Sequence, residues 1–234
     1  MNNDLQILFE DNHLLVTVKP AGILSQAGEK ELPDMLSILK NYLKDKYQKP
    51  GNVYLGLVHR LDLNVGGVMV FAKTSKAASR LSESIREHDF SKRYYAVVNG
   101  ILPIGQPQTL SNYLAKNEMT KMGFVTDQEQ GKLAQLSYTA IEQYQDNHQK
   151  LTLVKIDLLS GRFHQIRLQM ATIGHPLYGD NKYGNTLLKQ QQEGMGLFAY
   201  ELVFPHPITH EDMVFNALPE TAIFTKFAFF SLQK

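Results

Sequence analysis

Short runs of apolar and β-branched residues, bounded by Asp, Asn, Gly or Pro, predict most of the strands in this chain. Two runs flank Asp11-Asn12 and indicate an opening hairpin, and two later ones flank Asp146-Asn147. The segment 53–58 is apolar but broken by a glycine, and residues 68–72 are wholly apolar, as in a buried strand. The predicted strands are residues 5–10, 13–19, 68–72, 92–100, 110–117, 132–144, 150–159, 198–204 and 212–216.

Apolar positions three and four residues apart predict helices between these strands. A helix capped by Thr74 or Ser75 runs to about residue 88 and is expected to bury Ala78, Leu81 and Ile85. The other predicted helices are residues 34–48, residues from about 163 to 174, and a terminal helix after Pro219. Because the helices interrupt the strands without a regular βαβ rhythm, we expect an α+β fold. Its central sheet would be mixed and mostly antiparallel with flanking helices, forming a single domain over residues 1–234.

Composition and charge narrow the class of protein. Of the 234 residues 43% are hydrophobic and 20% charged, as in an ordinary soluble globular protein. Lys and Arg number 24 against 23 Asp and Glu, so a nucleic-acid partner would require locally gathered basic groups. Cysteine is absent, which excludes disulfides, thiolate metal sites and a cysteine nucleophile. Without a signal-peptide pattern or a run of roughly 20 apolar residues, we expect a cytoplasmic protein that spans no membrane.

Polar groups concentrate in a loop between the apolar segments 53–58 and 68–72. This loop brings His59, Arg60 and Asp62 close together in the sequence. Charged loops between rigid strands are where binding and catalytic residues gather. The alternative is a polar turn with an ordinary surface ion pair.

Three further stretches hold polar residues in unusual settings: 19–22, 92–100, and 160–168 with its continuation to residue 180. On a helix, Arg167 shares a face with His164, Leu168 and Ala171, so it would lie beside apolar neighbours. A half-buried arginine needs an anion.

These four stretches resemble those of the RluA family of RNA pseudouridine synthases, in the family's order from residue 5 to about residue 220. The matching motifs are Gly-Leu-Val-His59-Arg60-Leu61-Asp62, Lys92-x-Tyr94-x-Ala-x-Val-x-Gly100, Gly161-Arg-x-His-Gln-Ile-Arg167, His175-Pro176, Gly179-Asp180, His206-Pro207 and Leu218-Pro219. After Asp62 the family usually has a basic residue, an acidic one and Thr-Ser-Gly, whereas this chain has residues 63–67, Leu-Asn-Val-Gly-Gly. Many relatives carry a small RNA-binding domain before the catalytic one. With the first matching strand at residue 5, we expect RNA selection to fall to the catalytic domain, its insertions or a partner.

The resemblance implies an isomerase that converts uridine to pseudouridine in rRNA or tRNA without a cofactor or a metal. It implies that Asp62 attacks the target nucleotide or otherwise triggers cleavage of its glycosidic bond, inside a catalytic cleft. Arg167 would keep that carboxylate ionised and orient it. Tyr94 would stack on the detached uracil and take the proton from its carbon 5, with cationic or substrate-derived help.

The resemblance also implies substrate contacts. Arg60 would enter the gap left by the flipped base, and Leu168 would wall the uracil pocket against water. His59 is counted with the substrate-binding residues, although a hydrogen-bonded scaffold role is the alternative. The candidates for phosphate contacts, each of which could also be plain solvated surface, are Lys19, Lys73, Lys92, Arg93 and Arg162.

Each assignment has an alternative. Asp62 and Arg167 could form a structural ion pair, and Tyr94 could be a core aromatic. The glycine pairs and Gly179 are expected to serve tight turns, since none has the spacing of a phosphate loop. A metal site built from His59, His164, His175 and Asp180 lacks a compact ligand signature.

Two rival functions also remain. A catalytically idle RNA-binding module of the same fold would lack one of the three catalytic candidates, and all three are present. A glycoside hydrolase with Asp62 as nucleophile normally needs a second carboxylate, which the matching stretches do not supply. A monomer is the default, and the sequence does not identify the target RNA or uridine.

Overall fold

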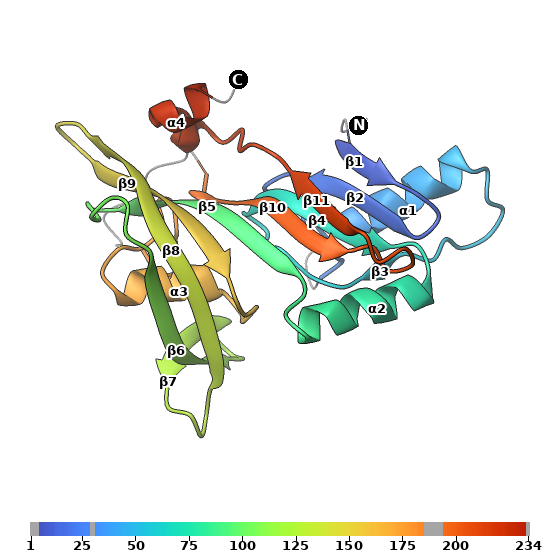
Figure 1. The fold of residues 1–234 in the computed structure, drawn as a ribbon, viewed down its shortest axis with the longest axis horizontal. Coiled ribbons are helices and arrows are strands. Elements are labelled where there is room, and N and C mark those ends of the chain that lie inside the picture. The colour runs from blue at the N-terminus through green and yellow to red at the C-terminus, as the bar shows by residue number, and fades with distance from the viewer. Residues whose placement is uncertain (1–4, 29–30, 185–193, 233–234) are drawn as a thin grey trace. The chain divides into compact units, whose positions relative to one another are not determined.

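The computed structural model describes residues 5–28, 31–184 and 194–232, and the chain divides into two compact units (Figure 1). The first unit contains the residues up to Ser91 and Ala199–Ala217; the second contains Lys92–Phe198 and the residues from Leu218 onward. The chain therefore passes between the units three times. That both units together form one catalytic domain stays a prediction.

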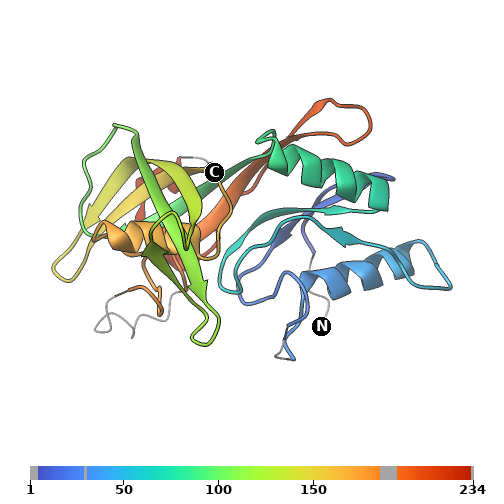
Figure 2. The ribbon, with the colours of Figure 1, turned by 90° about the horizontal axis from the view of Figure 1, so that it is seen from below.

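The first unit is a sheet with a helix on each face. Its strands follow the order β1-β2-β4-β10, β11 pairs with β10, and β3 pairs with β4. Figure 2 shows α1 and α2 on opposite sides of these strands. The elements of the first unit are β1 (Ile7–Glu10), β2 (Leu14–Lys19), α1 (Met35–Lys46), β3 (Gly56–Leu57), β4 (Gly66–Ala72), α2 (Ser75–Arg86), most of β10 (Leu197–Pro205) and β11 (Asp212–Asn216).

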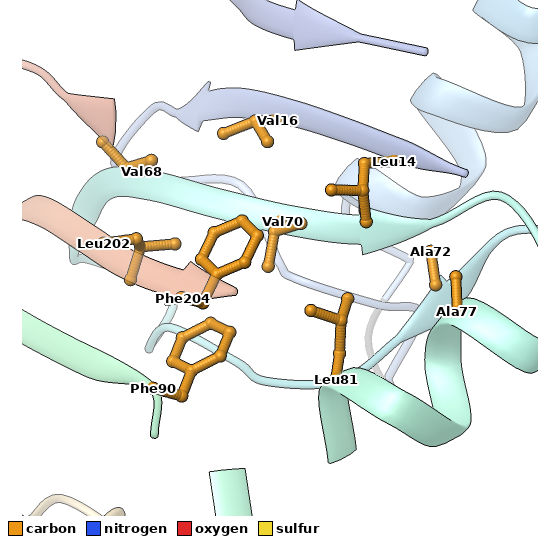
Figure 3. Close-up of a cluster of buried hydrophobic side chains, with 10 residues drawn as sticks. All are labelled: Leu14, Val16, Val68, Val70, Ala72, Ala77, Leu81, Phe90, Leu202 and Phe204. Atoms are coloured by element: carbon orange, nitrogen blue, oxygen red, sulfur yellow. The ribbon is translucent and has the colours of Figure 1, made fainter. Parts of the chain in front are cut away.

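Because side chains alternate along the strands, the sheet has two apolar faces, and each helix packs against one of them. On the α2 side, Val16 and Val70 pack with Leu81, Phe90 and Phe204 in one buried cluster (Figure 3). The rings of Phe90 and Phe204 stack with centroids 5.1 Å apart. This cluster fixes the strand β4 that leads out of the polar loop.

Both predicted helices of the first unit are present, and both begin at a side-chain cap. Asp34 accepts a hydrogen bond from the Ser37 N–H (2.9 Å), and Thr74 accepts one from the Ala77 N–H (3.1 Å). The buried stripe predicted for α2 is partly wrong. The helix buries Ala77 and Leu81, which are four residues apart, and leaves Ala78 and Ile85 only partly buried at the edge of that face.

The second unit is an antiparallel sheet in the order β5-β9-β8-β6-β7. Residues 122–126 form a strand that the sequence analysis missed, because the neighbouring Thr120, Lys121 and Gly123 interrupt any apolar pattern. The elements of the second unit are β5 (Ser91–Asn99, from Lys92 onward), β6 (Gln108–Asn117), β7 (Met122–Thr126), β8 (Lys132–Gln145), β9 (Lys150–Leu158), α3 (Gln165–Thr172), η2 (Ala222–Lys226) and α4 (Ala228–Ser231).

The terminal helix is shorter than predicted. It divides into the 3-10 turn η2 and the single turn α4, because Phe227 between them is extended (φ −103°, ψ 127°) and fully buried. The carboxylate of Glu142 accepts hydrogen bonds from the backbone N–H groups of Ala228 and Phe229, both at 2.8 Å. These bonds fasten the end of the chain to β8.

The predicted fold class is confirmed. The ladders β1–β2, β2–β4, β3–β4 and β10–β11 are antiparallel, as are those of the second unit, and isolated parallel bridges join residue 24 to 34 and residue 104 to 140. The result is an α+β fold with mixed, mostly antiparallel pairing. In the part of the chain that the structure describes, no helix has the length and apolar character needed to cross a bilayer.

Candidate active site

The polar loop of the first unit connects β3 to β4 and is anchored at its start by His59. The Nε2 atom of His59 accepts a hydrogen bond from the Val70 N–H (3.1 Å), so this nitrogen carries no proton. The imidazole also lies against the ring of Phe90, with centroids 5.5 Å apart. His59 thereby fixes the loop to β4, as expected of a scaffold residue. Its predicted contact with substrate remains untested.

The middle of the loop is fastened by Ser25. The buried Ser25 hydroxyl donates to the Leu61 carbonyl (2.8 Å) and accepts from the Leu61 N–H (3.0 Å). The carbonyl of Asp62 then accepts from the Val65 N–H (3.1 Å), which closes a turn. Asp62 is half-buried between these fixed points, and Arg60 is exposed. The main chain is therefore held by hydrogen bonds on both sides of Asp62.

Lys19 also anchors this loop, through a hydrogen bond to the main chain of Leu63. Its side chain has no exposed surface, and burial lowers the pKa of its ammonium to about 8 against the opposing effect of the charge on Asp62. The ammonium donates hydrogen bonds to three main-chain oxygens, those of Pro20 (2.9 Å), Ile23 (2.6 Å) and Leu63 (3.3 Å). These are the contacts of a residue that joins two loops. The predicted phosphate contact of Lys19 gains no support from them.

Tyr94 lies within β5 of the second unit. It is buried in β5 opposite Ile156 of β9. The next residue, Tyr95, points the other way and meets the rings of Phe229 and Phe230 edge-on at 5.5 and 5.0 Å. The pairing of β5 with β9 fixes the backbone at Tyr94.

Arg167 is buried in α3, and the structure supplies an anion for it. Its Nε donates to Oδ2 of Asp180 (2.7 Å) and its Nη2 to Oδ1 (2.8 Å), a two-pronged pair in which the Asp180 side chain is fully covered. Burial alone would raise the pKa of Asp180, but the hydrogen bonds and charge of Arg167 outweigh it and lower that pKa. The backbone N–H groups of Lys182 and Tyr183 also donate to this carboxylate.

Asp180 is a site residue that the sequence analysis did not assign to Arg167. Its signal was the Gly179-Asp180 pair, which was matched to a family motif, while Asp180 itself was considered only as a metal ligand. Gly179 does turn the chain there, with φ +71°. Gly67 behaves differently from the expected tight turn. A Cβ on Gly67 would lie 2.3 Å from the carbonyl oxygen of Ala199, so this glycine permits close approach of β4 and β10.

A tyrosine that the sequence analysis overlooked also lies beside Arg167. The guanidinium carbon lies 5.3 Å from the centre of the Tyr183 ring. The Tyr183 hydroxyl accepts from the Gly123 N–H (2.7 Å) and lies 2.9 Å from Nδ1 of His164. No spacing pattern marked Tyr183, because its role depends on the β6–β7 hairpin that was only partly predicted.

The start of α3 differs from the prediction. The helix begins at Gln165, and His164 precedes it in a left-handed conformation (φ 50°), which is uncommon outside glycine. His164 is therefore not on the helical face that was expected to carry it beside Arg167. Leu168 does lie on the helix and packs in a small buried cluster with Leu114, Ala134 and Tyr183.

The remaining cationic candidates lie near the surface. Arg162 is exposed and its Nε donates to the Leu133 carbonyl (2.9 Å). Arg93 forms an exposed ion pair with Asp157 (2.7 Å). Lys73 is bound to Glu10 (2.9 Å) in the first unit. Exposure leaves Arg162 able to meet a polyanion, whereas Arg93 and Lys73 are already paired with carboxylates.

The predicted residues are distributed over the two units. The first unit contains Lys19, His59, Arg60 and Asp62, and the second contains Tyr94, Arg162, Arg167 and Leu168. Among the described residues, no three His, Cys, Asp or Glu side chains are grouped so as to hold a metal ion. His175 instead has Nδ1 2.8 Å from the Asn99 carbonyl.

Comparison with known proteins gives a consistent result. Residues 13–172 match the family described as RNA pseudouridylate synthase. The chain is 33% identical over 216 residues to the dual-specificity RNA pseudouridine synthase RluA of Haemophilus influenzae, covering 91% of this chain and 92% of that protein. It is 34% identical over 218 residues to the ribosomal large subunit pseudouridine synthase C of Pasteurella multocida, covering 91% and 64%.

The fold matches solved structures as well. Human RNA pseudouridylate synthase domain containing 4 superposes with a TM-score of 0.75 at 21% identity, covering 94% of this chain and 90% of that one. Human RNA pseudouridylate synthase domain containing 1 gives 0.72, also at 21% identity, covering 92% and 83%.

Proposed function

The chain belongs to the RNA pseudouridylate synthase family, whose reaction converts uridine to pseudouridine in RNA, and we propose that Asp62, Tyr94 and Arg167 carry out this isomerisation. The observation that carries the proposal is that the matched residues 13–172 contain all three side chains.

Asp62 is assigned as the group that starts the reaction. Its carboxylate attacks the target nucleotide or otherwise promotes cleavage of the bond between N1 of uracil and C1′ of the ribose. The uracil then turns, carbon 5 bonds to C1′, and the proton on carbon 5 leaves while N1 gains one. The main-chain bonds of Leu61 and the turn closed by Val65 support this role, because a nucleophile must be held near its target.

Arg167 and Tyr94 are assigned to orientation and proton transfer. A guanidinium is always charged and presents its donors in a fixed plane, so it can orient a carboxylate while Asp180 holds it from the other edge. Tyr94 would stack on the detached uracil and accept the proton from carbon 5. All of these steps use side chains of the chain, so the proposal needs neither a cofactor nor a metal.

The substrate contacts follow the same logic. The exposed Arg60 is assigned to the gap that the flipped base leaves, where a planar guanidinium can offset part of the few kcal/mol that flipping costs. Leu168 would wall the uracil, and Arg162 would contact phosphate. For His59 and Lys19 we propose an indirect part: they hold the loop that presents Asp62 to the RNA.

The target RNA is proposed more broadly. The relatives named above are a dual-specificity synthase and a large-subunit ribosomal synthase, which supports rRNA or tRNA as the substrate class. A single catalytic domain formed by both units, a monomeric state and a cytoplasmic location stay predictions. The idle RNA-binding module and the glycoside hydrolase are not favoured, since the relatives named above are synthases.

The decisive experiment replaces Asp62 with Asn, which preserves shape and removes the negative charge. Pseudouridine formation in total rRNA and tRNA from cells lacking the protein should fall by on the order of 10⁴-fold or more, as for loss of a nucleophile. RNA affinity should stay within a few-fold. The matched control is Asp212→Asn, which changes an exposed aspartate of the same unit and should leave activity intact. Turnover by Asp62→Asn at the normal rate would remove Asp62 from the mechanism.

A further inference from the structure

The guanidinium of Arg167 is held on two sides by residues of one short segment. Asp180 binds its edge through two hydrogen bonds, and the ring of Tyr183 lies 5.3 Å from its centre. The N–H of Tyr183 also donates to the Asp180 carboxylate (3.2 Å), so a hydrogen bond links the carboxylate to the residue that carries the ring. A cation beside an aromatic ring is attracted to the electron-rich face of that ring.

The Tyr183 hydroxyl extends this arrangement to a distant part of the chain. It accepts a hydrogen bond from the main-chain N–H of Gly123 in β7, 60 residues earlier (2.7 Å). It also pairs with Nδ1 of His164, the left-handed residue before α3 (2.9 Å). One oxygen therefore joins the β6–β7 hairpin, the start of the arginine-bearing helix, and the ring beside the guanidinium.

Close packing makes the connection stiff. A Cβ on Gly123 would lie 3.2 Å from the Tyr183 hydroxyl and 3.3 Å from Cδ2 of Leu168, tighter than most real contacts. Leu114 of β6 and Leu168 belong to one buried cluster, and the partly buried Tyr183 packs against it. A displacement of the hairpin must therefore be passed to Tyr183, because well-packed interiors leave little room to absorb it.

We propose that Tyr183 is a positioning residue that couples the β6–β7 hairpin to the guanidinium of Arg167, so that the placement of this hairpin sets the direction in which the arginine points. The consequence for catalysis rests on the proposed function, because it assumes that Arg167 orients the reacting carboxylate. The coupling itself does not. It requires only that loss of the hydroxyl changes the surroundings of the guanidinium.

The test removes the hydroxyl and keeps the ring. In the ¹H–¹⁵N spectrum of the RNA-free protein, the Arg167 Nε–H signal is identified by its disappearance in Arg167→Lys. Tyr183→Phe should shift that signal. The matched control is Tyr144→Phe, which removes a hydroxyl bonded to Asp146 (2.9 Å) on an exposed turn of the same unit and should leave the signal in place. An unmoved Arg167 signal in Tyr183→Phe overturns the coupling.

A second variant disturbs the contact from the hairpin side. Gly123→Ala leaves Tyr183 and Arg167 chemically intact but forces the hairpin and the hydroxyl apart by a few tenths of an ångström. It should shift the same Nε–H signal. If Gly123→Ala shifts only signals within the hairpin, the hairpin does not set the arginine and the proposal is wrong.

Kinetics connect the coupling to the reaction. Tyr183→Phe should lower kcat by roughly 10- to 100-fold, the scale of a misplaced catalytic geometry, with KM for RNA within a few-fold. A purely structural weakening would lower the melting temperature and the active fraction but leave kcat per folded molecule unchanged, which would also overturn the proposal. If the unmutated protein forms no pseudouridine, the proposed function fails while the spectra still decide the coupling.

Discussion

The loop that carries Asp62 and the helix that carries Arg167 are stabilised in different ways. In the loop, Ser25 and Lys19 bond to main-chain atoms of the neighbouring Leu61 and Leu63. In the helix, the guanidinium of Arg167 itself forms two hydrogen bonds to Asp180. The first unit therefore fixes a backbone, and the second fixes a side-chain head group.

The length of each side chain explains this difference. An aspartate has few rotatable bonds, so a rigid backbone already gives its carboxylate a limited range of positions. An arginine loses up to about 2 kcal/mol of rotamer entropy when ordered, and a fixed backbone leaves its guanidinium free to move several ångströms. Direct contacts at the head group are needed to hold it. Three experiments in the two units test this contrast, and a fourth uses a carboxylate elsewhere in the first unit.

After Asp62, the largest effect is expected at Tyr94, whose backbone is fixed by the pairing of β5 with β9. Tyr94→Phe keeps the buried ring of β5 and removes the hydroxyl, so stability should change little. Turnover should fall by about 10²- to 10⁴-fold, the usual contribution of a general base. Quenched reactions should show the target nucleotide held after its glycosidic bond has broken.

The neighbouring tyrosine provides the control for this prediction. Tyr95→Phe removes a hydroxyl from the same strand, but Tyr95 faces Phe229 and Phe230 on the other side. It should leave turnover unchanged. Normal turnover in Tyr94→Phe would show that another group accepts the proton.

The next effect is expected at Asp180, the anchor of the arginine. Asp180→Asn removes the charge that a buried guanidinium faces and should lower the free energy of unfolding by about 3 kcal/mol, the low end for a broken buried pair. Urea unfolding at pH 7 measures this directly. Activity should fall as well, because the guanidinium loses its direction.

A double-mutant cycle separates the pair from general damage. If the loss comes from an uncompensated buried charge, Arg167→Met combined with Asp180→Asn should be more stable than Asp180→Asn alone. If the unfolding free energy of the double variant falls by the sum of the losses in the two single variants, the two residues act independently.

A smaller effect is expected at Lys19, the main-chain anchor of the aspartate loop. Lys19→Met has nearly the same length, but it leaves the oxygens of Pro20, Ile23 and Leu63 without this donor. The expected loss in unfolding free energy is about 1–3 kcal/mol. Faster hydrogen exchange should appear in residues 61–65. The control Lys76→Met, at an exposed position on α2, should change neither the unfolding free energy nor the rate of hydrogen exchange. An unchanged exchange rate in Lys19→Met would show that the loop is held without it.

The contrast also explains how much could be predicted from sequence. The loop of His59 and Asp62 was predictable because its polar residues are adjacent in the chain and flanked by apolar runs. The need of Arg167 for an anion was likewise predictable from its apolar helical neighbours. Most strand positions and the cap of α2 at Thr74 followed from local patterns and turn residues.

The rest depends on contacts between residues far apart in sequence. Asp180 lies 13 residues after Arg167, and Gly123 lies 60 before Tyr183, so no periodic pattern connects them. The strand β7 was missed because its residues are defined by pairing with β6 and not by apolar alternation. The full burial of Lys19 was equally hidden, since lysine is almost never fully buried and only three converging carbonyls make it so.

The smallest effect at neutral pH, and one that appears only in acid, is expected at Glu10, which is gripped at its head group like Arg167 but lies outside the proposed site. Burial would raise the pKa of Glu10, yet donors from Lys46, Lys73, Tyr47 and Tyr42 outweigh it and lower that pKa to about 2. In the unfolded chain the carboxylate takes up its proton near the ordinary value of 4.5. Its contribution to stability is therefore complete above pH 4.5 and is lost as the pH falls towards 2.

Unfolding in urea between pH 6 and pH 2.5 should show a weaker acid dependence in Glu10→Gln than in the unmutated protein. Glu118→Gln, which alters an exposed ion pair, should retain most of it. Equal acid dependence in Glu10→Gln and the unmutated protein would show that a carboxylate gripped at its head group outside the site adds nothing to acid stability.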